Sequence, residues 1–225
     1  MTETIITVQG QHTAYFPAER ATLHFSVNHD GSQRSAVFAR ATSAGDLLRG
    51  KIVALHNEST GPITWWASDS VRVWSDRPWN NEGKQLPLVY HAVIGFTAKF
   101  NEFDELARFI EDVADVDGVT ISQLEWALTD SRTRDVTAEV QSSAVQDAVS
   151  KATVYAKAIG LSSVTAVAVA DPGMLSDGGR GGAEFGMERT SFAMKAMDVG
   201  GAAELSLRPN DIEVSASVDV RFVAT

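Results

Sequence analysis

The sequence predicts an α+β fold in which three helices cover one face of a two-layer, mixed and mostly antiparallel sheet. Most of the expected strands alternate apolar and polar side chains, as at Leu23, Phe25 and Val27. Such alternation is typical of a sheet with one covered face, whereas doubly wound parallel sheets have continuous apolar strands. The order of the elements, in which strand, helix and strand recur along the chain, favours the same class.

The first part of the chain is expected to form two strands and then a helix. Alternating side chains predict strands over residues 3–10 and 20–28. Apolar residues spaced by three and four positions then predict a helix over 32–57, although Gly45 and Gly50 lower its helix propensity. These strands would bury one face and expose the other.

The middle of the chain repeats this pattern. Residues 63–75 are expected to be extended, and residues 88–100 alternate over a longer strand. An N-cap at Asn101 predicts a helix that ends near Gly118, where the glycine suits the end of a helix. Residues 120–128 then return as a strand.

The strongest helix signal covers residues 138–161. Alanines recur there at every fourth position and form a seam of small side chains on one face: Ala144, Ala148, Ala152 and Ala156. Such a seam lets another backbone layer approach closely. Asp147 and Lys151 are expected to form an i,i+4 ion pair on the exposed flank of this helix rather than a reactive pair.

The last part of the chain holds two more strands and a long connection. Residues 164–170 form a nearly continuous apolar run, which predicts a short strand buried on both faces, and residues 212–222 alternate. Between them, residues 171–209 hold eight of the 17 glycines and four of the five methionines, which predicts a long mobile loop. Because no change in composition marks a boundary, we expect a single domain over residues 1–225.

Charge and composition exclude several classes of function. The net charge is −10, and no Lys/Arg cluster offsets it, so we expect neither a nucleic-acid partner nor an anionic membrane surface. There is no cysteine, which removes thiol catalysis and thiolate metal sites. The first residues alternate at once, without a signal peptide or an apolar run long enough to span a membrane. We therefore expect a cytoplasmic protein.

Several segments, taken in their order and spacing, match a known bacterial family. They are ITVQGQ, YHAVIGFTAKFNEFDELARFIEDV, LEWALTDSRTRDVTAEVQSSAVQDAVSKATVYAKAIGL and LRPNDIEVSASVDVRF. In these segments the chain resembles the SIMPL-domain family, named after a signalling molecule that interacts with a mouse Pelle-like kinase. The resemblance implies an α+β fold and a tendency to form oligomers. It also implies roles in envelope biology, oxidative or other stress tolerance, or protein interaction, and it brings no agreed catalytic residues.

No residue pattern predicts a catalytic, metal or cofactor site. The five histidines lack the spacing of metal-binding motifs, and the glycine-rich run 177–182 lacks the order of a phosphate-binding loop. One polar group at the entrance to the long helix is a weak candidate site: Asp130, Arg132, Arg134 and Asp135. Solvated ion pairs, which contribute on the order of 0–1 kcal/mol each, are the simpler interpretation of that group.

A second group of residues suggests subunit contacts. Trp79 stands in a polar turn, and methionines recur in the loop 171–209 at Met174, Met187, Met194 and Met197. Trp and Met are favoured at protein interfaces, although packing onto the core of the same chain is the alternative.

The leading hypothesis is a non-enzymatic, self-associating protein whose sheet and long loop form subunit contacts in a homo-oligomer or with a protein partner. The alternative is a small-molecule-binding module in which residues 171–209 act as a lid over a pocket near Trp126 or Trp79. An acid–base enzyme is a third hypothesis, which the sequence does not support with any pair of titratable residues.

Overall fold

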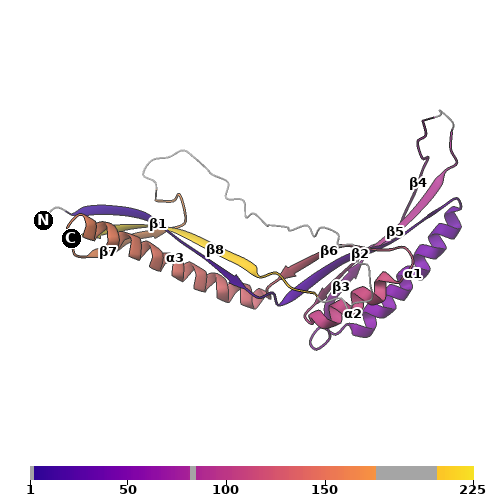
Figure 1. Cartoon of the computed structure of the whole chain (residues 1–225), viewed down its shortest axis with the longest axis horizontal. Helices are drawn as coiled ribbons and strands as arrows, with labels where there is room; N and C mark the ends of the chain where they lie inside the picture. Colours follow the sequence, from indigo (N-terminus) through magenta and orange to yellow (C-terminus); the bar gives the residue numbers. More distant parts are fainter. Residues whose placement is uncertain (1–2, 82–84, 176–206) are drawn as a thin grey trace. The chain divides into compact units, whose positions relative to one another are not determined.

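The structure is a computed structural model that describes residues 3–81, 85–175 and 207–225 (Figure 1). These residues form three helices and eight strands, which fold as two compact units. The described part of the terminal unit comprises residues 3–17, 128–175 and 211–225. The central unit comprises residues 18–81, 85–127 and 207–210.

The central unit is a five-stranded antiparallel sheet with two helices. Its strand order is β3-β5-β2-β6, and β4 also pairs with β5. The elements are β2 (Arg20–Gly31), α1 (Arg34–Leu55), β3 (Ile63–Ser68), β4 (Arg72–Asp76), β5 (Val89–Phe100), α2 (Phe103–Ala114) and β6 (Val119–Ala127). Both helices lie on the same side of this sheet (Figure 1).

Alternation along the strands builds the core of the central unit. The apolar face of β2 meets that of β5, where the rings of Phe25 and Phe96 stack with centroids 5.3 Å apart. Phe109 of α2 packs on both Phe25 and Phe100. Gly45 of α1 lies over Ile94, and a Cβ at that position would come within 2.7 Å of the Ile94 Cδ1 atom. The glycine that weakens the helix signal therefore lets α1 lie close to the sheet.

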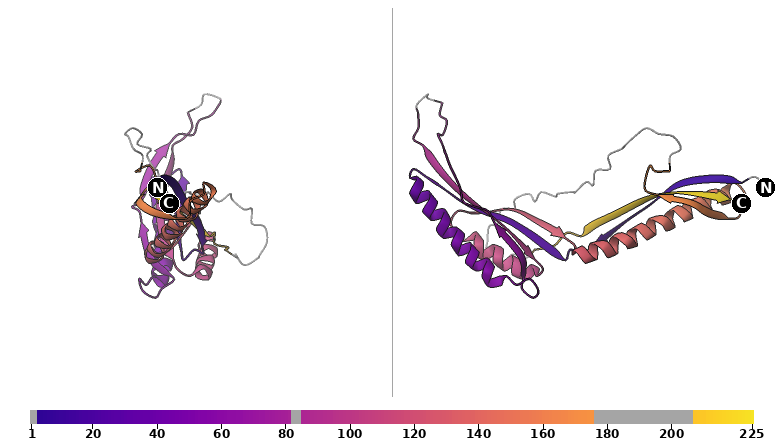
Figure 2. Two further views of the ribbon diagram at one scale, coloured as in Figure 1. Left: turned by 90° about the vertical axis from the view of Figure 1, so that its left-hand side faces the viewer. Right: turned by 180° about the vertical axis from the view of Figure 1, so that it is seen from behind.

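The terminal unit is a three-stranded antiparallel sheet with one long helix along one face (Figures 1 and 2). It contains β1 (Thr4–Phe16), α3 (Asp130–Ala158), β7 (Val164–Ala170) and β8 (Ile212–Ala224), with the strand order β1-β8-β7. The buried residues of α3 follow each other at every fourth position from Val136 to Ala156. They pack on alternate residues of β1 and β8, such as Val8 and Phe222.

The predicted α+β class with antiparallel sheets is confirmed, with two differences in arrangement. The strands divide between two sheets instead of forming one, and α3 covers a different sheet from α1 and α2. Residues 63–75 contain two strands, β3 and β4, and α3 begins at Asp130, earlier than the alanine pattern indicates. That a single domain spans residues 1–225 stays a prediction, since both units contain segments from separate parts of the chain.

The prediction that residues 164–170 are buried on both faces is wrong. This strand, β7, lies at the edge of the three-stranded sheet, and the side chains of Val167 and Val169 are 55% and 57% exposed. A continuous apolar run is typical of a strand in the middle of a sheet. Here it lies at an edge, which leaves apolar surface uncovered.

Candidate functional site

The alanine seam of α3 receives the backbone of β1 at Gly10. A Cβ at Gly10 would lie 2.8 Å from both the Cβ and the backbone nitrogen of Ala148, and it would overlap the carbonyl oxygen of Ala144. Ala144 and Ala148 are fully buried at this point. The predicted close approach of a backbone layer to this seam is therefore confirmed, and the glycine is its counterpart on the strand.

Asp147 and Lys151 also bind the backbone of β1 next to Gly10. Their i,i+4 ion pair is present at 2.6 Å. In addition, the Asp147 carboxylate accepts a hydrogen bond from the backbone N–H of Gln11 at 2.8 Å, and the Lys151 ammonium donates one to the carbonyl oxygen of Gln9 at 3.0 Å. The pair thus holds the two residues that flank Gly10.

These contacts also set the electrostatics of Asp147. The hydrogen bond from Lys151 and then that from the Gln11 N–H lower the pKa of Asp147 below its ordinary value of 3.8. The carboxylate therefore stays ionised and bound to the strand, which agrees with a structural role. The spacing of the pair predicts the ion pair, but the contacts with β1 require a register that the sequence does not show.

The candidate polar site at the start of α3 is not gathered into a pocket. Arg132 lies with its guanidinium carbon 5.4 Å from the centroid of the Phe16 ring, and its backbone N–H donates to the N-cap hydroxyl of Thr129. Asp130, Arg134 and Asp135 are exposed on the first turns of the helix. This group belongs to the beginning of a helix, and its role as a binding site stays a prediction.

The predicted contact residues Trp79 and Met174 are the most exposed of the large apolar side chains in the described residues. Trp79 is 84% exposed in the connection between β4 and β5, and Met174 is 73% exposed just after β7. The remaining predicted methionines lie outside the described residues: Met187, Met194 and Met197. Trp79 and Met174 thus do not pack onto their own units, which was the alternative for both residues.

The start of the predicted loop is attached to the terminal unit. The backbone N–H of Gly173 donates to the Asp219 carboxylate at 2.7 Å, and the Arg221 guanidinium donates to the carbonyl oxygen of Leu175 at 2.9 Å. Both acceptor and donor side chains come from β8. Met174 therefore stands on a short anchored segment beside the sheet.

The face of the five-stranded sheet away from the helices carries aromatic and charged side chains. Trp65, 46% exposed, has the Lys99 ammonium 5.0 Å from its ring centroid. Trp74, 41% exposed, stacks on His91, and the Arg72 guanidinium lies 5.2 Å from the Trp74 centroid. Each tryptophan thus already has a cation near its ring, which leaves less of its surface free for a ligand.

One acid–base row on this face was missed by the sequence reasoning. The His24 Nδ1 lies 3.2 Å from the Thr97 hydroxyl, and its Nε2 lies 4.0 Å from the Glu125 carboxylate. The three residues sit on the neighbouring strands β5, β2 and β6. Their polar positions can be predicted from alternation, but which strands are neighbours cannot. The hollow described below, at the start of α2, is lined by none of these three residues.

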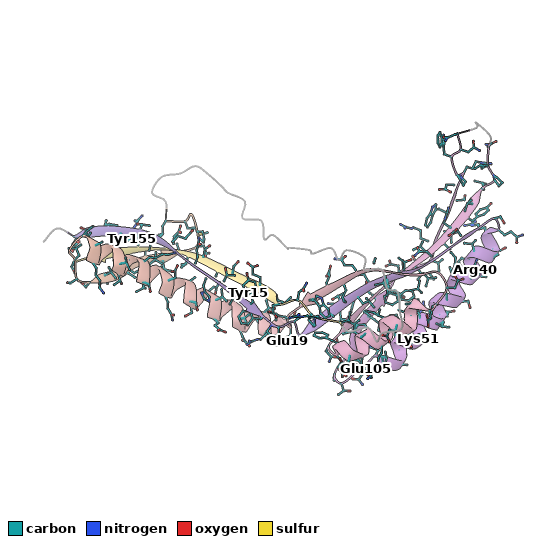
Figure 3. All side chains as sticks on the ribbon, in the orientation of Figure 1. Tyr15, Glu19, Arg40, Lys51, Glu105 and Tyr155 are labelled. Carbon is teal, nitrogen blue, oxygen red and sulfur yellow. The ribbon has the colours of Figure 1, made fainter. Side chains whose placement is uncertain are left out.

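Two ion pairs connect α1 to α2 and to the turn that follows α2, and Figure 3 labels their basic partners, Arg40 and Lys51, on α1. The Arg40 guanidinium lies 2.8 Å from the Asp117 carboxylate, and the Lys51 ammonium lies 3.0 Å from that of Asp112. The hydrogen bond from Arg40 lowers the pKa of Asp117 below its ordinary value. These are cross-links on the exposed side of the two helices, and they form no reactive centre.

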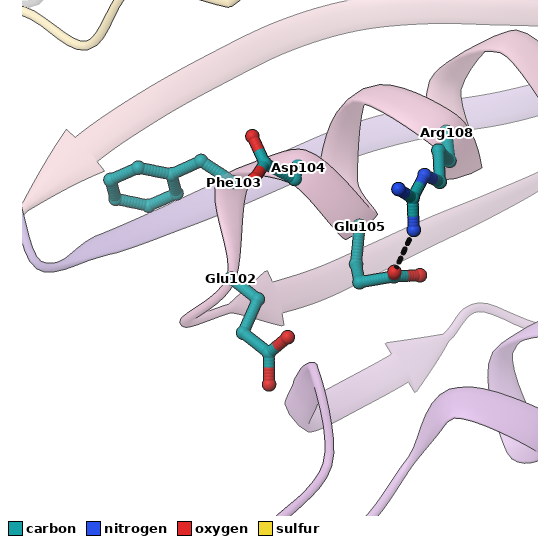
Figure 4. A pocket seen from close by; sticks show the side chains of 5 residues that line it. All are labelled: Glu102, Phe103, Asp104, Glu105 and Arg108. Atoms are coloured by element: carbon teal, nitrogen blue, oxygen red, sulfur yellow. Dashed lines mark hydrogen bonds and ion pairs between the residues drawn. The ribbon is translucent and has the colours of Figure 1, made fainter.

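A shallow hollow of about 400 Å³ lies at the start of α2 (Figure 4). It is lined by Glu102, Phe103, Asp104, Glu105 and Arg108, so a single stretch of chain provides all of its walls. Arg108 pairs with Glu105, and the Phe103 ring packs edge to face on Trp126. A hollow formed by one helical turn encloses little of a small molecule. Small-molecule binding under a lid therefore stays a prediction.

The comparisons with known proteins match the chain to one family. A family model described as SIMPL, protein of unknown function (DUF541), matches residues 6–222. The chain belongs to the SIMPL family. The match includes strands and helices of both units. Because the SIMPL family is described as being of unknown function, membership assigns no enzymatic activity. No curated protein matches the sequence.

Two further observations concern metals and membranes. In residues 3–81, 85–175 and 207–225, no group of three or more His, Cys, Asp or Glu side chains is placed to hold a metal ion. Within the same ranges, the helices are too short or too polar to cross a membrane.

Proposed function

We propose that this SIMPL-family chain is a non-enzymatic protein that associates with copies of itself through exposed apolar side chains. The observation that carries the proposal is the exposure of Trp79 and Met174, at 84% and 73%. Large aromatic and thioether side chains are enriched in the cores of protein interfaces, and a few such residues supply most of the binding energy. Exposed on single connecting segments, these two side chains suit contacts between subunits.

The polar groups of the molecule support a non-enzymatic role. Asp147 and Lys151 are engaged with the β1 backbone, and Arg40 is engaged with Asp117. The His24 and Glu125 side chains are 34% and 53% exposed, so water screens their charges. A cytoplasmic location remains part of the proposal.

Native mass spectrometry and light scattering at low micromolar concentration test the proposal. We expect the wild-type chain to form a dimer or larger oligomer, and we expect Trp79→Ala with Met174→Ala to lower the oligomer fraction. Val53→Ala is a matched control, because Val53 is 55% exposed on α1 and belongs to neither of the two connecting segments. A wild-type chain that stays monomeric over the concentration range would refute self-association.

A further inference from the structure

The apolar core of the terminal unit is uncovered at one edge. The strand registers place Val8, Val220 and Val169 side by side on β1, β8 and β7. Paired residues share a face of a sheet, and Val8 and Val220 pack against the alanine seam of α3 on that face. Val8 is 8% exposed and Val220 is fully buried, but Val169 is 57% exposed. The row is therefore covered at β1 and open at β7.

The backbone of β7 is open on the same side. Ser163 and Thr225 exchange two backbone hydrogen bonds, of 3.0 and 3.1 Å. In an antiparallel pair, residues whose backbone N–H and C=O groups bond to the neighbouring strand alternate with residues whose groups point away from it. After Ser163, the next residue of β7 with both groups directed toward β8 is therefore Thr165. The N–H and C=O groups of Val164 and Ala166 point away from β8. Within the described residues, β7 pairs with β8 alone. Such an edge accepts another extended strand.

The two edges of this sheet differ in charge. At β1, Asp147 and Lys151 occupy the backbone groups of Gln11 and Gln9. The sequence of β7, VTAVAVA, has no charged residue. Because a chain with a net charge of −10 repels its own copies, a contact between copies is least opposed where the strand is neutral.

We propose that β7 of one copy pairs antiparallel with β7 of a second copy, across a two-fold axis at Thr165. This inference rests on the proposed self-association and adds a second contact to that of Trp79 and Met174. Val164 of each copy exchanges backbone hydrogen bonds with Ala166 of the other, so two three-stranded sheets become one six-stranded sheet. The β-bulge between Ala166 and Ala168 ends the regular edge, which keeps the pairing short and centres it before the bulge. In this register the segment that precedes β7 of the second copy lies opposite Val169 and covers part of its side chain.

Cysteine cross-linking tests the register directly, because the chain has no cysteine of its own. On the axis, the two copies of Thr165 form a non-hydrogen-bonded pair with Cα atoms about 4.5 Å apart, within the range of a disulfide. Thr165→Cys is therefore expected to form a disulfide-linked dimer under mild oxidation, seen on a non-reducing gel. Thr7→Cys is the control: Thr7 is exposed on the opposite edge strand and is expected to stay monomeric on that gel.

A second pair of variants tests the uncovered core. Val169→Asp places a charge beside the edge, and we expect it to lower the dimer fraction at least tenfold. Val154→Asp is the control, since Val154 is 62% exposed on α3, and circular dichroism checks that both variants fold. If the wild type is monomeric, the proposed function itself is wrong. If it assembles, but Thr165→Cys does not cross-link and Val169→Asp has no effect, only the β7 pairing is wrong.

Discussion

Gly10→Ala is expected to destabilise the terminal unit because it adds a methyl group between β1 and α3. The new Cβ would lie 2.8 Å from two atoms of Ala148 and overlap the Ala144 carbonyl oxygen. Carbon atoms at van der Waals contact are about 3.5–4.0 Å apart, so the strand and the helix must separate by roughly 1 Å. The obstructing atoms belong to the helix backbone and to a side chain without rotamers, so no rotamer change can relieve the overlap.

The separation has an energetic cost that can be worked out from these contacts. Overpacking a well-packed core costs about 1–3 kcal/mol. A shift of β1 also lengthens the hydrogen bonds that Gln9 and Gln11 make with Lys151 and Asp147. We therefore expect a loss of about 3 kcal/mol in the free energy of unfolding, at the upper end of that range.

Two other glycines supply matched controls for the same substitution. Gly50, in α1, has no atom within 4 Å of its added Cβ, so Gly50→Ala is expected to stabilise by about 0.5–1 kcal/mol through helix propensity alone. At Gly45 the added methyl group overlaps the end of the Ile94 side chain, which can move, and makes an ordinary contact with Phe96. Gly45→Ala is expected to fall between the other two variants.

Urea unfolding followed by circular dichroism measures all three variants against the wild type. We expect Gly50→Ala to be more stable than the wild type and Gly10→Ala to be the least stable of the three variants. Gly45→Ala is expected to lie between these two variants. A Gly10→Ala protein within about 0.5 kcal/mol of the wild type would show that β1 and α3 are not packed as closely as the structure has them.

Three further predictions concern charge, exposure and the core. Because Lys151 and the Gln11 N–H lower the pKa of Asp147, the stability that they contribute is present above pH 3.8 and is lost as the pH falls through the lowered pKa. The unfolding free energies of wild type and Asp147→Asn should therefore converge as the pH falls below 3.8, and a constant difference would contradict this. Trp79→Ala should change the unfolding free energy of the monomer by less than about 0.5 kcal/mol, since the side chain is 84% exposed, and a larger loss in urea unfolding would place it in the core. Phe100→Ala should cost about 3–5 kcal/mol in the same assay, because Phe100 is fully buried against Phe109, and a near-neutral result would contradict the core packing.

Most elements of the fold could be predicted because they have a local signal. Alternation and spacing of three and four indicated the strands and helices, but β3 and β4 were predicted as one extended segment, and β1 and α3 are longer than predicted. The division into two sheets could not be predicted, because it depends on which strands pair. Nothing in the local pattern shows that residues 4–16 pair with residues 212–224 at the other end of the chain.

For the candidate site residues, too, the sequence does not show which residues from distant parts of the chain come together. The sequence singles out Trp79 as a large aromatic residue in a polar turn, but it leaves open whether the side chain packs onto the core of the same chain, and only the structure shows its exposure. The row of Thr97, His24 and Glu125 combines three strands, so no spacing along the chain reveals it. Contacts between a side chain and a distant backbone, such as that of Asp147 with Gln11, are hidden for the same reason.

The burial prediction for β7 was wrong because a continuous apolar run indicates that a strand is stabilised by burial, but does not show which part of the molecule buries it. In a parallel sheet, neighbouring strands and helices of the same chain cover such a strand. Here the described residues cover one edge of β7 and leave Val167 and Val169 exposed, while at β1 charged side chains occupy the backbone groups of Gln9 and Gln11. Strand addition is therefore favoured at the neutral β7 edge over the β1 edge, where two backbone groups are already bound. Pairing of two β7 edges leaves neither of them free, so this contact by itself joins two copies.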